Sequence, residues 1–273
     1  MKTFMLSLLA LTSLFISSCS QDETVLQESE SKTIESRGLG TSIEEVDFYY
    51  KGEHYQTVSY LLGDSIVGIE DPEIESLLTE LQNKPNLVTF SYPDGSYEYF
   101  DDYESFQNEK PRVLSYSAEV EKWYAQNPSI TPRGYVDVPN VGANRENIAN
   151  LFLHDDDNYE DTMREFDLQK NQGKIEIPHL KDYGMNDKTT SFCAFTMQNT
   201  QNLFELFEDD NYRSHCFSFL VTMSTHVGMN TGQMAVQEPH GDFCCPNLKN
   251  IHVAGTNKSS WNDRITSIRI TQQ

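Results

Sequence analysis

The chain has 273 residues and a formal charge of -22, from 20 lysines and arginines against 42 aspartates and glutamates. This excess of negative charge argues against nucleic acid or an anionic lipid surface as the partner, and it makes cations the natural counterpart. The length allows one large domain or two small ones with real cores, and the changes of composition along the chain indicate two.

Residues 1–19 have the layout of a secretory signal, with Lys2, an apolar run over 4–16 and small residues before Cys19. The apolar run is too short to span a bilayer comfortably. The final Ile-Ser-Ser-Cys resembles the lipobox of bacterial lipoproteins, and the acidic stretch 20–23 is similar to the surface-export tag of Bacteroidetes lipoproteins. These resemblances imply lipidation of Cys19 and a location on the outer membrane or cell surface. The alternative is an ordinary cleaved signal.

The segment after the signal, residues 20–42, is rich in Glu, Ser, Thr and Gln and has few large apolar groups. Such a composition cannot bury enough surface to order the chain. We therefore expect a disordered tether that holds the folded part away from the membrane.

Residues 43–128 are predicted to form a small α+β domain. Aromatic and β-branched residues flank turns at 51–54 and 93–95, which indicates two hairpins, and the Asp-Gly pair in the second turn supplies the positive φ angles of a tight turn. Between the hairpins, Asp71 and Pro72 are typical of a helix start. The apolar stripe of that helix consists of Ile74, Leu77, Leu78 and Leu81, which repeat at helical spacing. A further short helix is expected over 117–127 and a linker over 129–134.

The C-terminal part, 147–273, has strand-like segments separated by acidic turns, which predicts a mainly β fold. It also repeats itself, with motifs over about 148–196 and 202–271. Each copy has an acidic hairpin, Leu151–Tyr159 or Leu203–Tyr212, and closes with a short polar segment.

The closing segments Asn186–Ser191 and Asn262–Ser267 both resemble the N/D-N/D-x-x-S/T-S signature of calcium-binding βγ-crystallins. The hairpins look like the aromatic hairpin of the same family, although Ser214 and Asp161 stand where glycine is expected and His154 replaces an aromatic residue. This resemblance implies a double Greek-key β-sandwich for 147–273, which would bind up to two calcium ions.

Calcium prefers six to eight oxygen ligands, and the two hexapeptides supply amide, carboxylate and hydroxyl oxygens. In the family each hairpin completes the site begun by the hexapeptide of the other motif. Carried over, this implies one site formed by Asn186, Asp187, Thr190 and Glu208. It implies a second site formed by Asn262, Asp263, Thr266 and Asp155.

Two alternatives to calcium binding remain for this region. In the first, the hydroxyls only cap turns, and Asp and Asn serve loop conformation. In the second, His226, His240, Cys244 and Cys245 bind zinc, although their spacing matches no common ligand pattern and disulfides are favoured. We expect Cys193 to pair with Cys216.

The sequence contains no nucleophile elbow, zinc-protease motif or phosphate-binding glycine loop, so we expect a binding or structural module and not an enzyme. A different class is the metalloproteinase inhibitor of crystallin-like fold, which would use the loop around Cys244 and Cys245. Beyond calcium and the membrane, the expected partner is a surface protein or glycan.

Overall fold

The computed structural model describes residues 41–62, 65–109, 147–197, 200–222, 226–227, 240–251, 253–255 and 260–273. The chain divides into the units Met1–Glu30 and Ser31–Gln273, and all described residues lie in the second. The signal and lipidated Cys19, the tether up to residue 40, the helix expected over 117–127 and the linker over 129–134 therefore lie outside the described residues. Within the described part, no helix is both long and apolar enough to cross a membrane.

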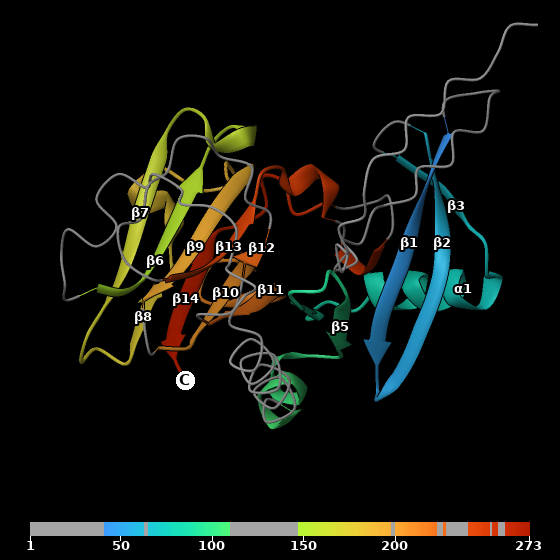
Figure 1. The fold of residues 1–273 in the computed structure, drawn as a ribbon, viewed down its shortest axis with the longest axis horizontal. Helices are drawn as coiled ribbons and strands as arrows, with labels where there is room; N and C mark the ends of the chain where they lie inside the picture. The colour runs from blue at the N-terminus through green and yellow to red at the C-terminus, as the bar shows by residue number, and fades with distance from the viewer. Residues whose placement is uncertain are drawn as a thin grey trace, which may run out of the picture. The chain divides into compact units, whose positions relative to one another are not determined.

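The fold is mainly β, with two sheets of nine and five strands. In the 41–109 segment, the strands are β1 (Thr41–Tyr50), β2 (Glu53–Leu62), β3 (Ser65–Ile69), β4 (Val88–Ser91) and β5 (Tyr97–Phe100). In the C-terminal part, they are β6 (Asn147–His154), β7 (Met163–Gln169), β8 (Lys174–Ile177), β9 (Ser191–Met197), β10 (Asn202–Asp209), β11 (Arg213–Val221), β12 (His226–Val227), β13 (His240–Cys245) and β14 (Ser267–Gln272). Figure 1 labels most of them.

The 41–109 segment folds largely as the sequence predicts. The hairpins β1–β2 and β4–β5 both form, and Gly52 and Gly95 adopt φ angles of 80° and 89° in their turns. Helix α1 (Pro72–Gln82) begins at Asp71, whose side chain accepts hydrogen bonds from the amides of Glu73 and Ile74. The strand β3 and a helical stretch over 103–109 were not predicted.

Helix α1 buries the stripe that the sequence indicates. Ile74, Leu78 and Leu81 are buried, and Leu77 packs partly buried against the same core. Their helical spacing places them on one face. A helix of this length is marginally stable alone, so packing of this face against the core stabilises it.

The C-terminal part consists of two Greek-key motifs that exchange strands. The first motif contributes β6, β7 and β9 to the five-stranded sheet, but its third strand, β8, pairs with β14 in the nine-stranded sheet. The second motif contributes β10, β11 and β14 to the nine-stranded sheet, but β13 pairs with β9 in the five-stranded sheet. The exchange makes each motif depend on the other.

The inner faces of both sheets share one hydrophobic core. Leu151 and Phe192 contribute from the five-stranded sheet, and Phe204, Phe217 and Ile268 contribute from the nine-stranded sheet. Burial of these large side chains from water is the main force that holds the sandwich together.

Strands of the two segments meet in the nine-stranded sheet. Strand β4 pairs in parallel with β11, from Val88 opposite Cys216 to Ser91 opposite Phe219. A second apolar cluster, which includes Phe90, Phe106 and Phe207, covers this junction. The 41–109 segment and the sandwich are therefore joined by backbone hydrogen bonds as well as by side-chain packing.

The expected pairing of Cys193 with Cys216 is wrong, because Cys193 bonds to Cys244. Cys193 and Cys244 lie directly opposite each other on β9 and β13, with 4.1 Å between their Cα atoms. Cys216 lies on β11, in the other sheet. Both Cys216 and Cys245 are buried free thiols.

Candidate functional site

The two motifs present the same loop geometry at their hairpins. Asn158 and Tyr159 in the first motif correspond to Asn211 and Tyr212 in the second, and all four have φ angles between 54° and 63°. At the positions where glycine is expected from the resemblance, Asp161 and Ser214 also have positive φ angles, 58° and 64°. The backbone thus keeps the conformation that favours glycine, although both residues carry side chains.

His154 takes the place of an aromatic residue in the first hairpin. Its ring lies edge-on to Tyr159 at 5.8 Å, and the corresponding pair Phe207 and Tyr212 has the same arrangement at 5.6 Å. The His154 side chain is 3% exposed, and neither ring nitrogen has a hydrogen-bond partner. Burial lowers the pKa of His154 to about 4, since the charged form would lose its hydration.

This histidine predicts a pH-dependent loss of stability. Its folded-state pKa lies below the ordinary value, so the unfolded chain takes up the proton first as the pH falls from about 6.5 to about 4. The contribution of His154 to stability should fall through this window by up to about 3 kcal/mol and stay constant at lower pH.

The His154→Phe variant should remove that part of the pH dependence. Urea unfolding of the variant and the parent between pH 4 and 7 tests this. Subtracting one stability profile from the other removes the effect of other titrating groups. Glu165 is such a group, because burial and the neighbouring Asp167 raise its pKa to about 7. Parallel pH profiles of the two proteins would contradict the role of His154.

The last residue of each hexapeptide closes its own hairpin. The Ser191 hydroxyl donates to the Asp156 carbonyl at 2.6 Å and accepts from the Tyr159 amide at 3.1 Å. Ser267 does the same with Asp209 and Tyr212, at 2.7 and 3.1 Å. For these two serines the turn-capping alternative is correct, since their hydroxyls hold the hairpin backbone in place.

The fifth residue of each hexapeptide, Thr190 or Thr266, lies close to acidic groups and is nearly buried. The Thr190 hydroxyl lies 3.3 Å from the Asp263 carboxylate, which belongs to the other motif. The Thr266 hydroxyl donates to the Glu208 carbonyl at 2.9 Å. Oxygen atoms of carbonyl, hydroxyl and carboxylate groups therefore gather between the hexapeptides and the hairpins.

The structure brings the predicted residues together in a different grouping from the expected one. The Thr266 hydroxyl contacts Glu208, and the Thr190 hydroxyl contacts Asp263. In the structure each threonine contacts the hairpin backbone of its own motif, since the Thr190 amide donates to the His154 carbonyl at 2.9 Å, whereas Asp263 contacts the threonine of the other motif. We define the motif-1 site by Asp155, Thr190 and Asp263, and the motif-2 site by Glu208, Thr266 and Asp187.

Asp187 is the acidic residue of the first hexapeptide, and its charge interacts with acidic residues of the second hairpin and with Asp263. Burial raises the pKa of Asp187, and the charges of Asp210, Asp263, Asp209 and Glu208 raise it further. The Asp187 carboxylate thus lies in the field of the motif-2 hairpin, where a bound cation would relieve the repulsion.

Asn186 and Asn262 orient the aspartates that follow them. Their side-chain amides donate to the carboxylates of Asp187 and Asp263 at 2.5 and 2.6 Å. The side-chain oxygen of Asn262 is buried and has no hydrogen-bond partner. An orphaned amide oxygen beside a carboxylate fits a hard cation, which takes oxygen ligands of this kind.

The third residue of each hexapeptide is basic, Lys188 in the first and Arg264 in the second, and neither is among the predicted ligands. Lys188 lies 3.7 Å from the Asp155 carboxylate, and Arg264 forms a salt bridge with Glu208, the corresponding residue of the second hairpin. Although burial opposes it, hydrogen bonds from His215 and Arg264 lower the pKa of Glu208 to about 2. The Glu208 carboxylate is therefore engaged by His215 and Arg264, and Glu208 contributes its backbone carbonyl to the motif-2 site.

Among the residues that the structure describes, no group of three or more His, Cys, Asp or Glu side chains is arranged to hold a metal. The zinc alternative also loses a ligand, since Cys244 forms the disulfide. The candidate sites described above depend instead on hydroxyl and carbonyl oxygens combined with single carboxylates.

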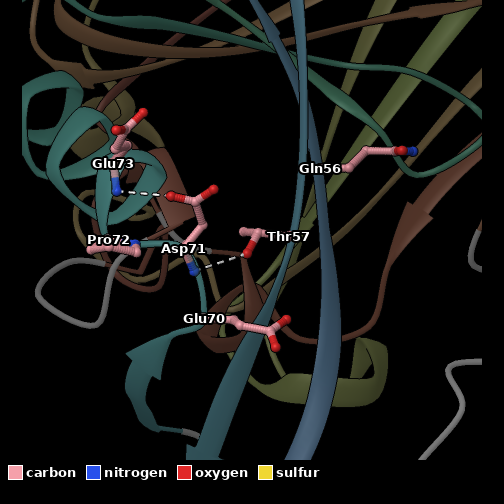
Figure 2. Close-up of a pocket in the computed structure, with 6 residues that line it drawn as sticks. All are labelled: Gln56, Thr57, Glu70, Asp71, Pro72 and Glu73. Carbon is pink, nitrogen blue, oxygen red and sulfur yellow. Dashed lines mark hydrogen bonds between the residues drawn. The ribbon is translucent and has the colours of Figure 1, made fainter.

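A surface pocket of about 590 Å³ lies at the start of α1 (Figure 2). It is lined by Gln56, Thr57, Glu70, Asp71, Pro72 and Glu73. Its central polar groups are engaged in the helix cap, because Asp71 accepts from the Glu73 amide at 2.8 Å and donates its own amide to Thr57 at 3.3 Å. None of the predicted ligands lines this pocket.

No family model and no curated protein matches the sequence. Solved structures similar to this chain include a βγ-crystallin from Ciona intestinalis, with 16% identity over 45% of this chain and 99% of the other and a TM-score of 0.25. A βγ-crystallin domain from Clostridium beijerinckii has 17% identity, covers 44% and 95%, and has a TM-score of 0.23. A clostrillin double mutant in complex with nickel has 17% identity, covers 45% and 97%, and has a TM-score of 0.23. The double Greek-key description rests on the strand pairing of this chain itself.

Proposed function

We propose that this protein is a calcium-binding structural or interaction module, with up to two ions held between the hexapeptides and the hairpins. The observation that carries the proposal is the contact of the Thr190 hydroxyl with the carboxylate of Asp263, an oxygen pair contributed by both motifs. Calcium suits such a site, because it accepts mixed oxygen ligands at flexible geometry, whereas magnesium requires a near-ideal octahedron.

The charge distribution supports the same function. The motif-2 hairpin has three consecutive acidic residues, Glu208–Asp210, and Asp187 lies in their field. Calcium would reduce this repulsion and would bind the folded chain only, so it should raise the melting temperature.

Single substitutions should separate the two sites. Asp187→Asn is expected to weaken the motif-2 site and Asp263→Asn the motif-1 site, each by about tenfold or more, since each removes the negative charge of one carboxylate ligand. Calorimetric titration of calcium into parent and variants measures the number of ions and their affinities.

Asp182→Asn is a suitable control for that titration, because Asp182 is an exposed acid of the same fold that belongs to neither site. Its calcium binding should equal that of the parent. If the Asp187 and Asp263 variants also bind calcium as the parent does, the assignment of the two sites is wrong.

We further propose that the chain is anchored to the outer membrane or cell surface through Cys19 and presents this module to a surface protein or glycan. The disulfide between Cys193 and Cys244 supports an exported location, where such bonds persist. Incorporation of labelled palmitate into the parent but not into Cys19→Ala tests the anchor.

Cys244 and Cys245 are buried in strand β13, so they do not form the exposed loop that the inhibitor alternative requires.

A further inference from the structure

The hairpin of the motif-2 site has a second set of contacts, on residues 84–87 of the preceding segment. The Glu208 carbonyl faces the site, where it accepts the Thr266 hydroxyl at 2.9 Å. The Glu208 carboxylate bonds to the Nδ1 atom of His215, and the Nε2 atom of His215 lies 2.8 Å from the carbonyl oxygen of Lys84. One residue thus belongs to the candidate cation site and to the bridge that leads away from it.

Two more contacts extend this bridge into the sheet. The Ser214 hydroxyl donates to the Pro85 carbonyl at 3.3 Å, and the Cys216 amide donates to the Leu87 carbonyl at 3.0 Å. From Cys216 onward, β11 pairs with β4. The residues that follow the hairpin therefore form the start of the junction between the sandwich and the 41–109 segment.

The motif-1 hairpin has no corresponding bridge within the described residues. Thr162 occupies the position equivalent to His215, and the strand that follows, β7, is the outermost strand of the five-stranded sheet in the described part of the chain. The Asp155 carboxylate pairs with Lys188 of its own motif. The two candidate sites thus differ in what their hairpins touch.

We propose that occupancy of the motif-2 site controls how tightly the β4 region is held against β11, whereas the motif-1 site has no such effect. This coupling rests on the proposed calcium binding. A cation on the Glu208 carbonyl would fix the backbone of the residue whose carboxylate positions His215, and it would thereby favour the docked state of residues 84–91. By thermodynamic reciprocity, the docked state raises the affinity of the motif-2 site by the same factor.

Hydrogen exchange of peptides covering residues 84–92 tests the forward direction. Calcium should slow their exchange about fivefold or more in the parent and in Asp263→Asn, but not in Asp187→Asn. Peptides from β6 serve as the internal reference for global stabilisation. Equal protection of residues 84–92 in the two variants would overturn the proposal.

A matched pair of substitutions tests the reverse direction. His215→Ala should lower the affinity of one of the two calcium-binding steps about fivefold, whereas Thr162→Ala, at the equivalent position of the other motif, should change neither. Far-ultraviolet circular dichroism checks that both variants fold, and His215→Gln, which retains side-chain hydrogen bonding, should lose less affinity than His215→Ala. Equal calcium binding by His215→Ala and Thr162→Ala would overturn the coupling.

The outcomes separate this inference from the proposed function. If the parent binds calcium but exchange of residues 84–92 does not respond to it, the coupling is wrong and the proposed function stands. If the parent binds no calcium, both are wrong.

Discussion

Replacement of Arg269 by methionine is expected to lower the free energy of unfolding by about 3–5 kcal/mol, because it breaks a buried ion pair. The guanidinium lies 3.6 Å from the carboxylate of Glu205, which is 1% exposed, and it donates to the Tyr103 hydroxyl at 2.7 Å. It also lies over the ring of Tyr212, 4.4 Å from the ring centroid. Methionine keeps the bulk but leaves Glu205 as a buried charge without its cation.

Urea unfolding at pH 7 measures this effect, with unchanged slope as the check that both proteins unfold alike. Arg213→Met is the matched control, because Arg213 is an exposed arginine at the start of β11, and it should change stability by less than about 0.5 kcal/mol. The double variant Arg269→Met, Glu205→Gln should regain much of the loss, since it no longer buries a charge. A loss below about 1 kcal/mol in Arg269→Met would contradict the role of this ion pair.

Removal of the disulfide by the double substitution Cys193→Ala, Cys244→Ala is expected to cost about 4 kcal/mol. The bond spans a sequence separation of 51 residues, so its loss frees a long loop in the unfolded chain. It also links the last strand of the first motif to the exchanged strand of the second, in addition to their backbone pairing and the packing of Phe243 against Phe192.

Cys245→Ala is the control for loss of a buried sulfur atom, because Cys245 is a free thiol beside the disulfide and 6% exposed. It should cost about 1 kcal/mol. Thermal and urea unfolding of both variants measure the difference. If the double variant is no less stable than Cys245→Ala, the disulfide does not stabilise the exchanged strand.

Local features of the fold could be predicted from the sequence. Asp71 and Pro72 mark the start of α1, and Gly52 and Gly95 mark two hairpin turns, because each of these residues acts on its immediate neighbours. The repeat of hairpin and hexapeptide also predicted two motifs, and the positive φ angles at Asp161 and Ser214 confirm the turn geometry despite the departure from glycine.

Long-range pairing could not be predicted from local pattern. The disulfide depends on the register of β13 against β9, and the pairing of β4 with β11 joins segments more than 100 residues apart in the chain. Neither leaves a periodic signal in the residues concerned. From the sequence alone, Glu205 would be expected to be exposed. Its burial depends on Tyr103 and Arg269, which are distant in sequence and contact its carboxylate in the structure.

The grouping of the candidate ligands also lay beyond the sequence. The eight residues are recognisable from the motif, but the choice of threonine for each hairpin depends on how the two motifs face each other. The charge pattern contains a further signal, because Lys188 and Arg264 occupy the same position of the hexapeptides, and Asp155 and Glu208 occupy the same position of the hairpins. Their opposite charges predict the pairs that the structure contains.

Calorimetric titration of calcium into the metal-stripped parent protein, with thermal unfolding recorded alongside and magnesium as the comparison ion, tests the central claim most directly. The account predicts saturable binding of one or two calcium ions, a higher melting temperature with calcium, and much weaker binding of magnesium. Absence of both heat and stabilisation at calcium concentrations up to about 5 mM, above the dissociation constants typical of extracellular calcium modules, would contradict it.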